Sequence, residues 1–139
     1  MNARTTPRRT VPKDELGQLL FDVFDRECPS RHALEHITTR WALLALAALH
    51  EGAARFSALR RKVDGVSEKM LSQTLHTLER DGFVHREAQP TIPPRVDYSL
   101  TPLGREFANM LVYLIEQLEG RMPAITLAQE RYDSAKSPR

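Results

Sequence analysis

Two short segments of alternating apolar residues, separated by a proline-rich loop, constrain the fold of this chain most strongly. Residues 83–87 read as one β-strand, and residues 96–100 alternate between apolar and polar side chains as a returning strand does. Three prolines within residues 90–94 stiffen the loop between them. The sequence therefore predicts a β-hairpin in a chain whose other periodic segments have helical spacing.

Helical periodicity predicts most of the remaining structure. Thr38-Thr39 divides one long periodic segment into two helices, and Gly82 ends another. Ser67 has the chemistry of a helix N-cap, and Thr101-Pro102 is a strong helix start. The expected helical segments are residues 14–26, 31–50, 56–63, 67–80 and 102–121.

Length and composition are those of one ordinary globular domain. The chain has 139 residues, of which 41% are hydrophobic and 27% charged, and this balance argues against a wholly disordered protein. We expect a disordered basic arm at residues 1–12, one domain at residues 13–122 and a polar tail at residues 123–139. The sequence contains no recognisable membrane span or secretory signal, so we expect a cytoplasmic protein without membrane contact or cofactor.

The order of the expected elements predicts the fold class. Two helices, at residues 56–63 and 67–80, are joined by a tight turn that contains Gly65, and the β-hairpin follows them. This order is typical of a helix-turn-helix with a wing. We therefore expect a mainly α-helical protein with a small β-hairpin wing, in which residues 55–100 form the winged helix-turn-helix.

The helix expected at residues 67–80 has two chemically different faces. Leu71, Leu75 and Leu78 fall in a narrow arc of the helical wheel and are expected in the core. Side chains opposite them suit the major groove of DNA, where amides pair with adenine and cations reach guanine or phosphate. Any surface helix also exposes polar residues, so the wheel alone leaves both interpretations open. The outer residues are Lys69, Gln73, His76 and Arg80, flanked by Met70, Ser72 and Thr77.

Basic side chains accompany this face at two other places. Arg60, Arg61 and Lys62 follow one another on the preceding helix, where a helix-turn-helix crosses the phosphate backbone. Arg95 follows Pro93-Pro94 in the hairpin, where the prolines allow an arginine to be presented to DNA at little ordering cost. Each cluster taken alone is equally typical of a solvated charged surface.

Six segments between Cys28 and Gly104 form one connected pattern. Cys28-Pro29 opens it, and the basic-Trp pair Arg40-Trp41 comes next. The other segments are Arg55-Phe56-Ser57-Ala58-Leu59-Arg60-Arg61, residues 65–73, residues 78–84 and residues 93–104. Together they resemble the HxlR-type family of bacterial winged-helix transcriptional regulators, and the stretch at residues 93–104 is the most specific.

The resemblance implies a homodimer that binds double-stranded DNA at a palindromic operator, with one recognition helix in each major groove. Two positions depart from the family pattern: Thr38-Thr39 stands where a glycine usually precedes the basic-Trp pair, and Thr74 stands where a basic residue is usual. The second departure bears on which operator is read. The candidate DNA-contacting residues are Arg60, Arg61, Ser67, Lys69, Met70, Ser72, Gln73, His76, Thr77, Arg80, Pro94 and Arg95.

The first and last expected helices, residues 14–26 and 102–121, supply apolar side chains for pairing two chains. Their spacing along the last helix is typical of a helix-pairing seam. Filling the core of their own chain is the alternative role for the same residues. The candidate dimer-interface residues are Leu16, Leu20, Phe24, Leu111, Leu114 and Leu118.

Cys28 is the only cysteine of the chain and precedes a predicted helix. The positive end of a helix dipole lowers the pKa of a thiol there, and Arg31 and His32 are close enough in sequence to add positive potential. Some members of the family respond to quinones, aldehydes or oxidants through a cysteine at this position. The resemblance therefore implies a sensor thiol with a small electrophile, oxidant or other effector, and a small buried apolar residue is the alternative.

Other functions fit the sequence less well. The chain has no Gly-rich phosphate loop, His-Glu metal motif or nucleophile elbow, so we expect no enzyme. Cys28, His32 and His36 have the spacing of one helix face, but three ligands need a fourth, so we expect no metal site. A winged helix used for protein–protein contact is the main rival, and the polar outer face argues against it. A repressor is favoured over an activator because blocking needs only occupancy.

Overall fold

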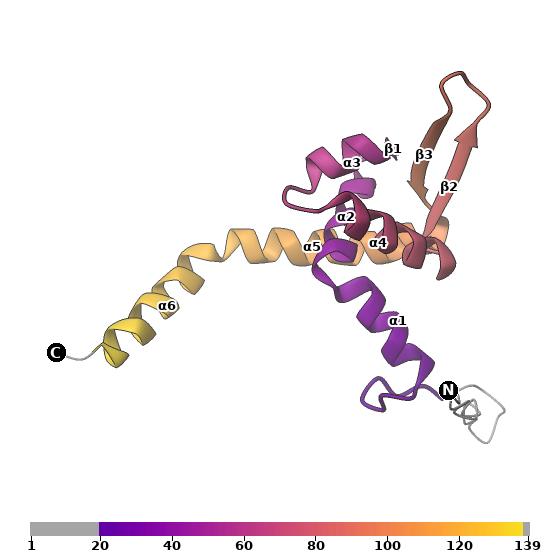
Figure 1. Ribbon diagram of the computed structural model, residues 1–139. Helices are drawn as coiled ribbons and strands as arrows, with labels where there is room; N and C mark the ends of the chain where they lie inside the picture. Colours follow the sequence, from indigo (N-terminus) through magenta and orange to yellow (C-terminus); the bar gives the residue numbers. More distant parts are fainter. Residues whose placement is uncertain (1–19, 138–139) are drawn as a thin grey trace, which may run out of the picture.

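The fold is a winged helix-turn-helix with helices that extend from both ends, as the sequence predicts (Figure 1). The structure is a computed structural model that describes residues 20–137, so the expected arm at residues 1–12 and the candidate interface residue Leu16 lie outside the described residues. The elements are α1 (Pro29–Thr38), α2 (Arg40–His50), β1 (Ala54–Arg55), α3 (Phe56–Lys62), α4 (Glu68–Arg80), β2 (Val84–Gln89), β3 (Arg95–Leu100), α5 (Pro102–Gly120) and α6 (Met122–Lys136).

The wing, formed by β2 and β3, belongs to a three-stranded antiparallel sheet. Strand β3 lies between β1 and β2, and the β2–β3 register runs from the pair Val84 and Leu100 at the base to Gln89 and Arg95 near the tip. The predicted hairpin is therefore confirmed. The two-residue strand β1 was not expected, because two residues are too few to show alternation.

One hydrophobic core lies between α2, α4 and the base of the wing. The predicted leucine face of α4 is confirmed, since Leu71, Leu75 and Leu78 are at most 1% exposed. Helix α2 packs against them and against the first half of α5. Its buried residues are Ala42, Ala45, Leu46 and Leu49.

The expected break at Thr38-Thr39 is confirmed. Thr39 has extended backbone angles between α1 and α2, and the Thr38 hydroxyl donates to the Leu34 carbonyl oxygen at 2.7 Å. The break turns α2 relative to α1, so a single apolar stripe does not continue across both. Leu34 and Leu44, which fall on that stripe in the sequence, are accordingly exposed.

The helix expected at residues 14–26 is not present in its described part. Residues 23–28 form turns and bends instead, because the carboxylates of Asp22 and Asp25 accept hydrogen bonds from the backbone N–H groups of Phe24 and Glu27, each at 2.9 Å. Aspartate side chains that bond the backbone two residues ahead favour turns over helix. Residues 14–19 lie outside the described part of the chain.

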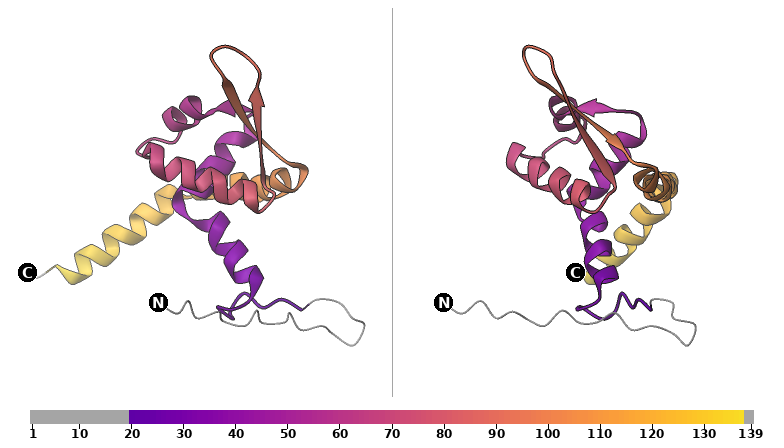
Figure 2. Two further views of the ribbon diagram at one scale, coloured as in Figure 1. Left: turned by 45° about the vertical axis from the view of Figure 1, so that its right-hand side comes forward. Right: turned by 90° about the vertical axis from the view of Figure 1, so that its right-hand side faces the viewer.

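The polar tail expected after Pro123 is also corrected, because α6 continues to Lys136. Proline is tolerated in the first turn of a helix, where its missing N–H group has no helical partner. Pro123 therefore belongs to the start of α6 and does not end a helix. None of the residues of α6 is buried, and the helix projects away from the core (Figures 1 and 2).

Thr101 and Gly104 connect the base of the wing to α5. The Thr101 hydroxyl accepts the Gly104 N–H group at 2.9 Å, which confirms the predicted N-cap, and it donates to the Gly82 carbonyl oxygen at 2.5 Å. The backbone N–H of Thr101 donates to the Phe83 carbonyl oxygen at 3.1 Å. A Cβ atom on Gly104 would stand 1.8 Å from that same oxygen, so the α5 backbone approaches β2 as closely as glycine alone permits.

Gly104→Ala is expected to destabilise the protein by about 1–3 kcal/mol or more, because the added methyl group collides with backbone that cannot move aside freely. Gly120→Ala is the matched control, since a Cβ atom there meets nothing within 4 Å in the described structure. That control is expected to gain about 0.5–1 kcal/mol. Urea unfolding followed by circular dichroism measures both, and equal midpoints for Gly104→Ala and wild type would contradict the expectation.

Candidate nucleic-acid interface

Helix α4 presents the expected polar face to solvent. Ser67 caps the helix, because its hydroxyl oxygen accepts the Met70 N–H group at 3.1 Å. The cap fixes the start of the helix and thereby the direction in which the outer side chains point. Exposed residues on this side are Lys69, Met70, Ser72, Gln73, His76 and Arg80, and Thr77 is half-buried at the edge.

The cations near α4 differ in how they are paired. Arg60 lies 3.2 Å from a Glu68 oxygen and Arg80 lies 3.4 Å from an Asp81 oxygen. Both pairs involve exposed arginines, and such pairs contribute about 0–1 kcal/mol, so an approaching phosphate can displace them. Arg61 and Lys69 have no ion-pair partner among residues 20–137 and are exposed.

The structure brings the end of α3 and the start of α4 together around one open hollow. Its volume is about 610 Å³, and Arg60, Arg61 and Ser67 lie on its wall. Two of the basic residues predicted from the sequence thus stand beside the capped end of α4. The exposed N–H groups and the positive dipole at a helix start favour anions.

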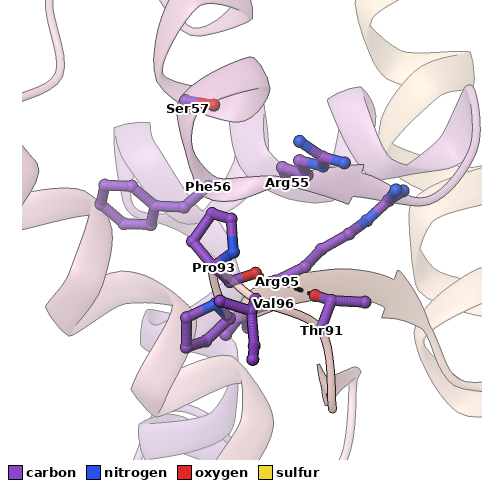
Figure 3. Close-up of a pocket in the computed structure, with 9 residues that line it drawn as sticks. Arg55, Phe56, Ser57, Thr91, Pro93, Arg95 and Val96 are labelled. Atoms are coloured by element: carbon purple, nitrogen blue, oxygen red, sulfur yellow. Dashed lines mark hydrogen bonds between the residues drawn. The ribbon is translucent and has the colours of Figure 1, made fainter.

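Near the wing tip, a second hollow of about 580 Å³ lies between the start of α3 and the β2–β3 loop (Figure 3). Arg95, which was predicted, contributes its side chain here, and its Nε atom donates to the Asp97 carboxylate at 3.1 Å. Arg55 of β1 extends to the same side (Figure 3) and is paired in register with Asp97. We did not single out Arg55 as a contact, because only the β1–β3 pairing places it beside Arg95.

Cys28 is 7% exposed, and its sulfur has two close polar neighbours. The Ser30 hydroxyl lies 3.3 Å from Sγ, and the backbone N–H of Asp22 donates to Sγ at 3.3 Å. These hydrogen bonds, with Ser30 contributing most, hold the pKa of the Cys28 thiol below its ordinary value, while burial acts against them. The lowered pKa was expected, but hydrogen bonds cause it. Arg31 instead contacts Glu35 at 2.7 Å and the Val23 carbonyl oxygen.

The candidate interface residues divide between surface and core. Leu20, Phe24, Leu114 and Leu118 are exposed, and Phe24 reaches 90%. Leu111 is buried in the core of its own chain, where it follows Gly104 and Ala108 along the inner side of α5, so the alternative role applies to it. Met110, Tyr113 and Met122, which we had not named, add to the exposed apolar side chains on α5 and α6.

Within residues 20–137 no group of three His, Cys, Asp or Glu side chains is placed to hold a metal ion. Cys28 is the N-cap of α1 and His36 faces Asp81, so Cys28, His32 and His36 do not converge on one point. In the same part of the chain, no helix is long and apolar enough to cross a membrane.

Residues 36–126 match the HxlR-like helix-turn-helix family. The chain belongs to this family. Curated relatives of this HxlR-like protein are named as HTH-type transcriptional regulators, which makes it a member of a family of DNA-binding regulators. One is YtfH of Escherichia coli (strain K12), whose specific role is uncharacterised. It is 49% identical over 109 residues, which cover 78% of this chain and 86% of YtfH.

Solved structures support the same fold. YtfH of Salmonella typhimurium, described as a candidate transcriptional regulator, is 47% identical with a TM-score of 0.75, over 80% of this chain and 99% of that one. The redox regulator HypR in its oxidised form is 34% identical with a TM-score of 0.62, over 67% of this chain and 96% of HypR.

Proposed function

We propose that this HxlR-like protein is a homodimeric repressor that binds a palindromic operator and leaves it when Cys28 is oxidised or modified by an electrophile. The observation that carries the proposal is the division of α4 into a fully buried leucine face and an exposed polar face. Helix α4 is thereby anchored to the core by one face, while the side chains that suit base edges stay free to contact DNA.

Base reading is assigned to the middle of the exposed face of α4. Gln73 can pair bidentately with adenine, and Lys69 can reach guanine or a phosphate. Both are exposed and lie one turn apart on the same helix. A face used for protein contact would carry large apolar residues here, and Met70 is the single such residue among the outer set.

Phosphate binding is assigned to α3 and the wing. Arg60 and Arg61 stand beside the start of α4, and Arg95 stands near the tip of the wing. Arg55 joins this set because its side chain extends to the same side as that of Arg95 (Figure 3). Cations on both sides of α4 would bind the phosphates that flank the major groove and fix the register of the helix.

Gln73→Ala and Arg61→Ala are expected to weaken DNA binding in different ways. Loss of a base contact should cost about 1–3 kcal/mol on the operator alone, whereas loss of a phosphate contact should weaken operator and random DNA alike and reduce the salt slope by about 1. Fluorescence anisotropy with DNA upstream of the protein's own gene, at several salt concentrations, measures both effects.

Arg131→Ala is the matched control for charge, because Arg131 is exposed on α6, outside the helix-turn-helix. It is expected to leave affinity and salt slope unchanged. If Gln73→Ala and Arg61→Ala lose the same affinity on operator and random DNA, the division into base and phosphate contacts is wrong. The wild-type protein is also tested on DNA upstream of the divergent neighbouring gene. If it binds neither upstream DNA more tightly than random DNA, a winged helix used for protein–protein contact becomes the better interpretation.

Dimerisation is typical of the family, and the exposed apolar side chains of α5 fit this role. Met110, Leu114 and Leu118 are exposed and are spaced four residues apart, so they form one stripe along α5. The second half of α5 and all of α6 extend away from the core (Figure 1). Binding of the dimer to a palindromic operator would require its two α4 helices to lie about 34 Å apart, one turn of DNA.

Leu114→Glu is expected to convert the dimer into a monomer, because it would bury a carboxylate without a partner in the apolar interface. Sedimentation velocity at micromolar concentration measures the change. Ile92→Glu is the control, since Ile92 is fully exposed in the wing loop and distant from α5 in sequence. A Leu114→Glu protein that sediments like wild type would show that this side of α5 is not the interface.

The thiol response rests on the environment of Cys28 and on its place at the start of α1. Its sulfur accepts hydrogen bonds that favour the thiolate, which is the reactive form. With one cysteine in the chain, a disulfide needs the Cys28 of the other subunit or a small thiol. HypR, a relative of similar fold, is named a redox regulator, and this supports the proposal.

Diamide with glutathione is expected to abolish operator binding by wild type and to leave Cys28→Ser bound. Ser30→Ala should react more slowly at pH 7, because removing the hydroxyl raises the pKa of Cys28 and lowers the thiolate fraction. The difference should narrow at pH values well above the ordinary thiol pKa, where both thiols are ionised. Mobility shifts after timed treatment measure this.

Ser134→Ala, an exposed serine on α6, is the control and should react like wild type at every pH. Operator binding that is indifferent to diamide would return Cys28 to a purely structural role and leave the regulator proposal intact. A Ser30→Ala protein that reacts at the wild-type rate at pH 7 would contradict the assigned cause of the lowered pKa.

A further inference from the structure

Helix α4 is not packed tightly along its whole length against the helices that precede it. A hollow of about 240 Å³ separates the α1–α2 junction from the adjacent side of α4. Gln73 and Thr77, on the edge of the proposed DNA-reading face, line it. Its walls are formed by His36, Thr39, Trp41 and Ala42 on one side and by Met70, Gln73, Thr74 and Thr77 on the other.

Beside this hollow, a hydrogen bond connects α1 to the end of α4. Nδ1 of His36 lies 2.5 Å from Oδ2 of Asp81, across 45 positions of sequence. A carboxylate oxygen can only accept, so the imidazole N–H donates. The Asp81 side chain is 15% exposed, so this hydrogen bond is shielded from water on most sides.

Asp81 is the residue at which α4 ends. Its N–H group donates to the Thr77 carbonyl oxygen, and Gly82, with φ of +83°, turns the chain toward the wing. Its other carboxylate oxygen lies 3.4 Å from Arg80, which belongs to the outer face of α4. One side chain therefore links α1, the end of α4 and a cation of the proposed interface.

We propose that His36 is a positioning residue for DNA recognition, which acts by holding Asp81 and thereby the rotation of α4. This inference rests on the proposed function of α4 as the recognition helix. Because the hollow leaves the Gln73 side of α4 without close packing, the bond at Asp81 replaces packing as the constraint on that side. The same hydrogen bond gives the Asp81 carboxylate a partner other than Arg80, so that Arg80 can leave Asp81 and bind a phosphate.

Removal of His36 has two physical consequences under this proposal. The end of α4 gains rotational freedom, which moves Gln73 relative to the base edges it would read, about 12 Å up the helix. Asp81 also keeps Arg80 as its remaining partner and holds it away from DNA. Both effects reduce the affinity for the operator more than the affinity for random DNA, where register is unimportant.

The experiment compares His36→Ala, His36→Asn and Asp81→Ala with wild type, by anisotropy on the operator and on random DNA of the same length. His36→Ala is expected to lower the ratio of operator to random affinity about twofold to thirtyfold. His36→Asn should restore most of the ratio, because its amide nitrogen stands near the place of Nδ1 and can donate to Asp81. His36→Ala combined with Asp81→Ala should lose less than the sum of the single losses.

His32→Ala is the matched control, since His32 is exposed on the same helix one turn earlier and should keep the wild-type ratio. Urea midpoints separate folding from recognition: the ratio must fall in protein that is folded under the assay conditions. An unchanged ratio in His36→Ala would overturn the proposal, as would a loss equal on both DNAs. His36→Asn as impaired as His36→Ala would overturn it too.

Wild-type protein that shows no preference for its operator would overturn the proposed function and this inference together. Wild-type protein that prefers the operator, with His36→Ala unchanged, would overturn the inference alone. The two failures are therefore distinguishable in one titration series.

Discussion

Burial of the leucine face of α4 is the interaction on which the rest of the structure depends. Leu71, Leu75 and Leu78 are removed from water almost completely, and each such side chain contributes about 1.5–3 kcal/mol to folding. Their packing against α2 and the base of the wing fixes which side of α4 faces outward. The polar side is therefore a consequence of the core, and the cations of α3 and the wing are placed relative to it by the same packing.

Features governed by neighbours in sequence were predictable. The caps at Ser67 and Thr101, the break at Thr38-Thr39 and the hairpin all follow from residue types within a few positions of one another. The predictions that were wrong also concern local structure, but there the sequence pattern is weaker. Two aspartates convert an apparently periodic segment around residues 20–28 into turns. Pro123 looked like the end of helical structure, yet it occupies the first turn of α6, where its lack of an N–H group costs nothing.

Site features that join distant residues were beyond sequence reasoning. The exposed residues of α4 could be assigned from a helical wheel because one helix contains all of them. Arg55 comes beside Arg95 only through the pairing of β1 with β3, and His36 meets Asp81 across 45 positions of sequence. The low pKa of Cys28 was expected from a helix start, but the hydroxyl of Ser30 and the N–H of Asp22 produce it. In the sequence, Leu111 and Leu114 fit a helix-pairing seam equally well. Only the position of the core shows that Leu111 is buried and Leu114 is exposed.

The Thr101 hydroxyl has a consequence for how two chains would measure a DNA site. It accepts from Gly104 at the start of α5 and donates to Gly82 just after α4, while Phe83 lies too close to Gly104 for any side chain between them. Gly82, which follows the C-cap of α4, is therefore connected directly to the start of α5. In a dimer joined along α5, the crossing angle of the two α5 helices would therefore determine the distance between the two α4 helices. The contacts of Thr101 would allow little variation in that distance. Such a dimer would hold its two α4 helices at a nearly constant separation. It would therefore tolerate a changed base in the operator more readily than an inserted base pair.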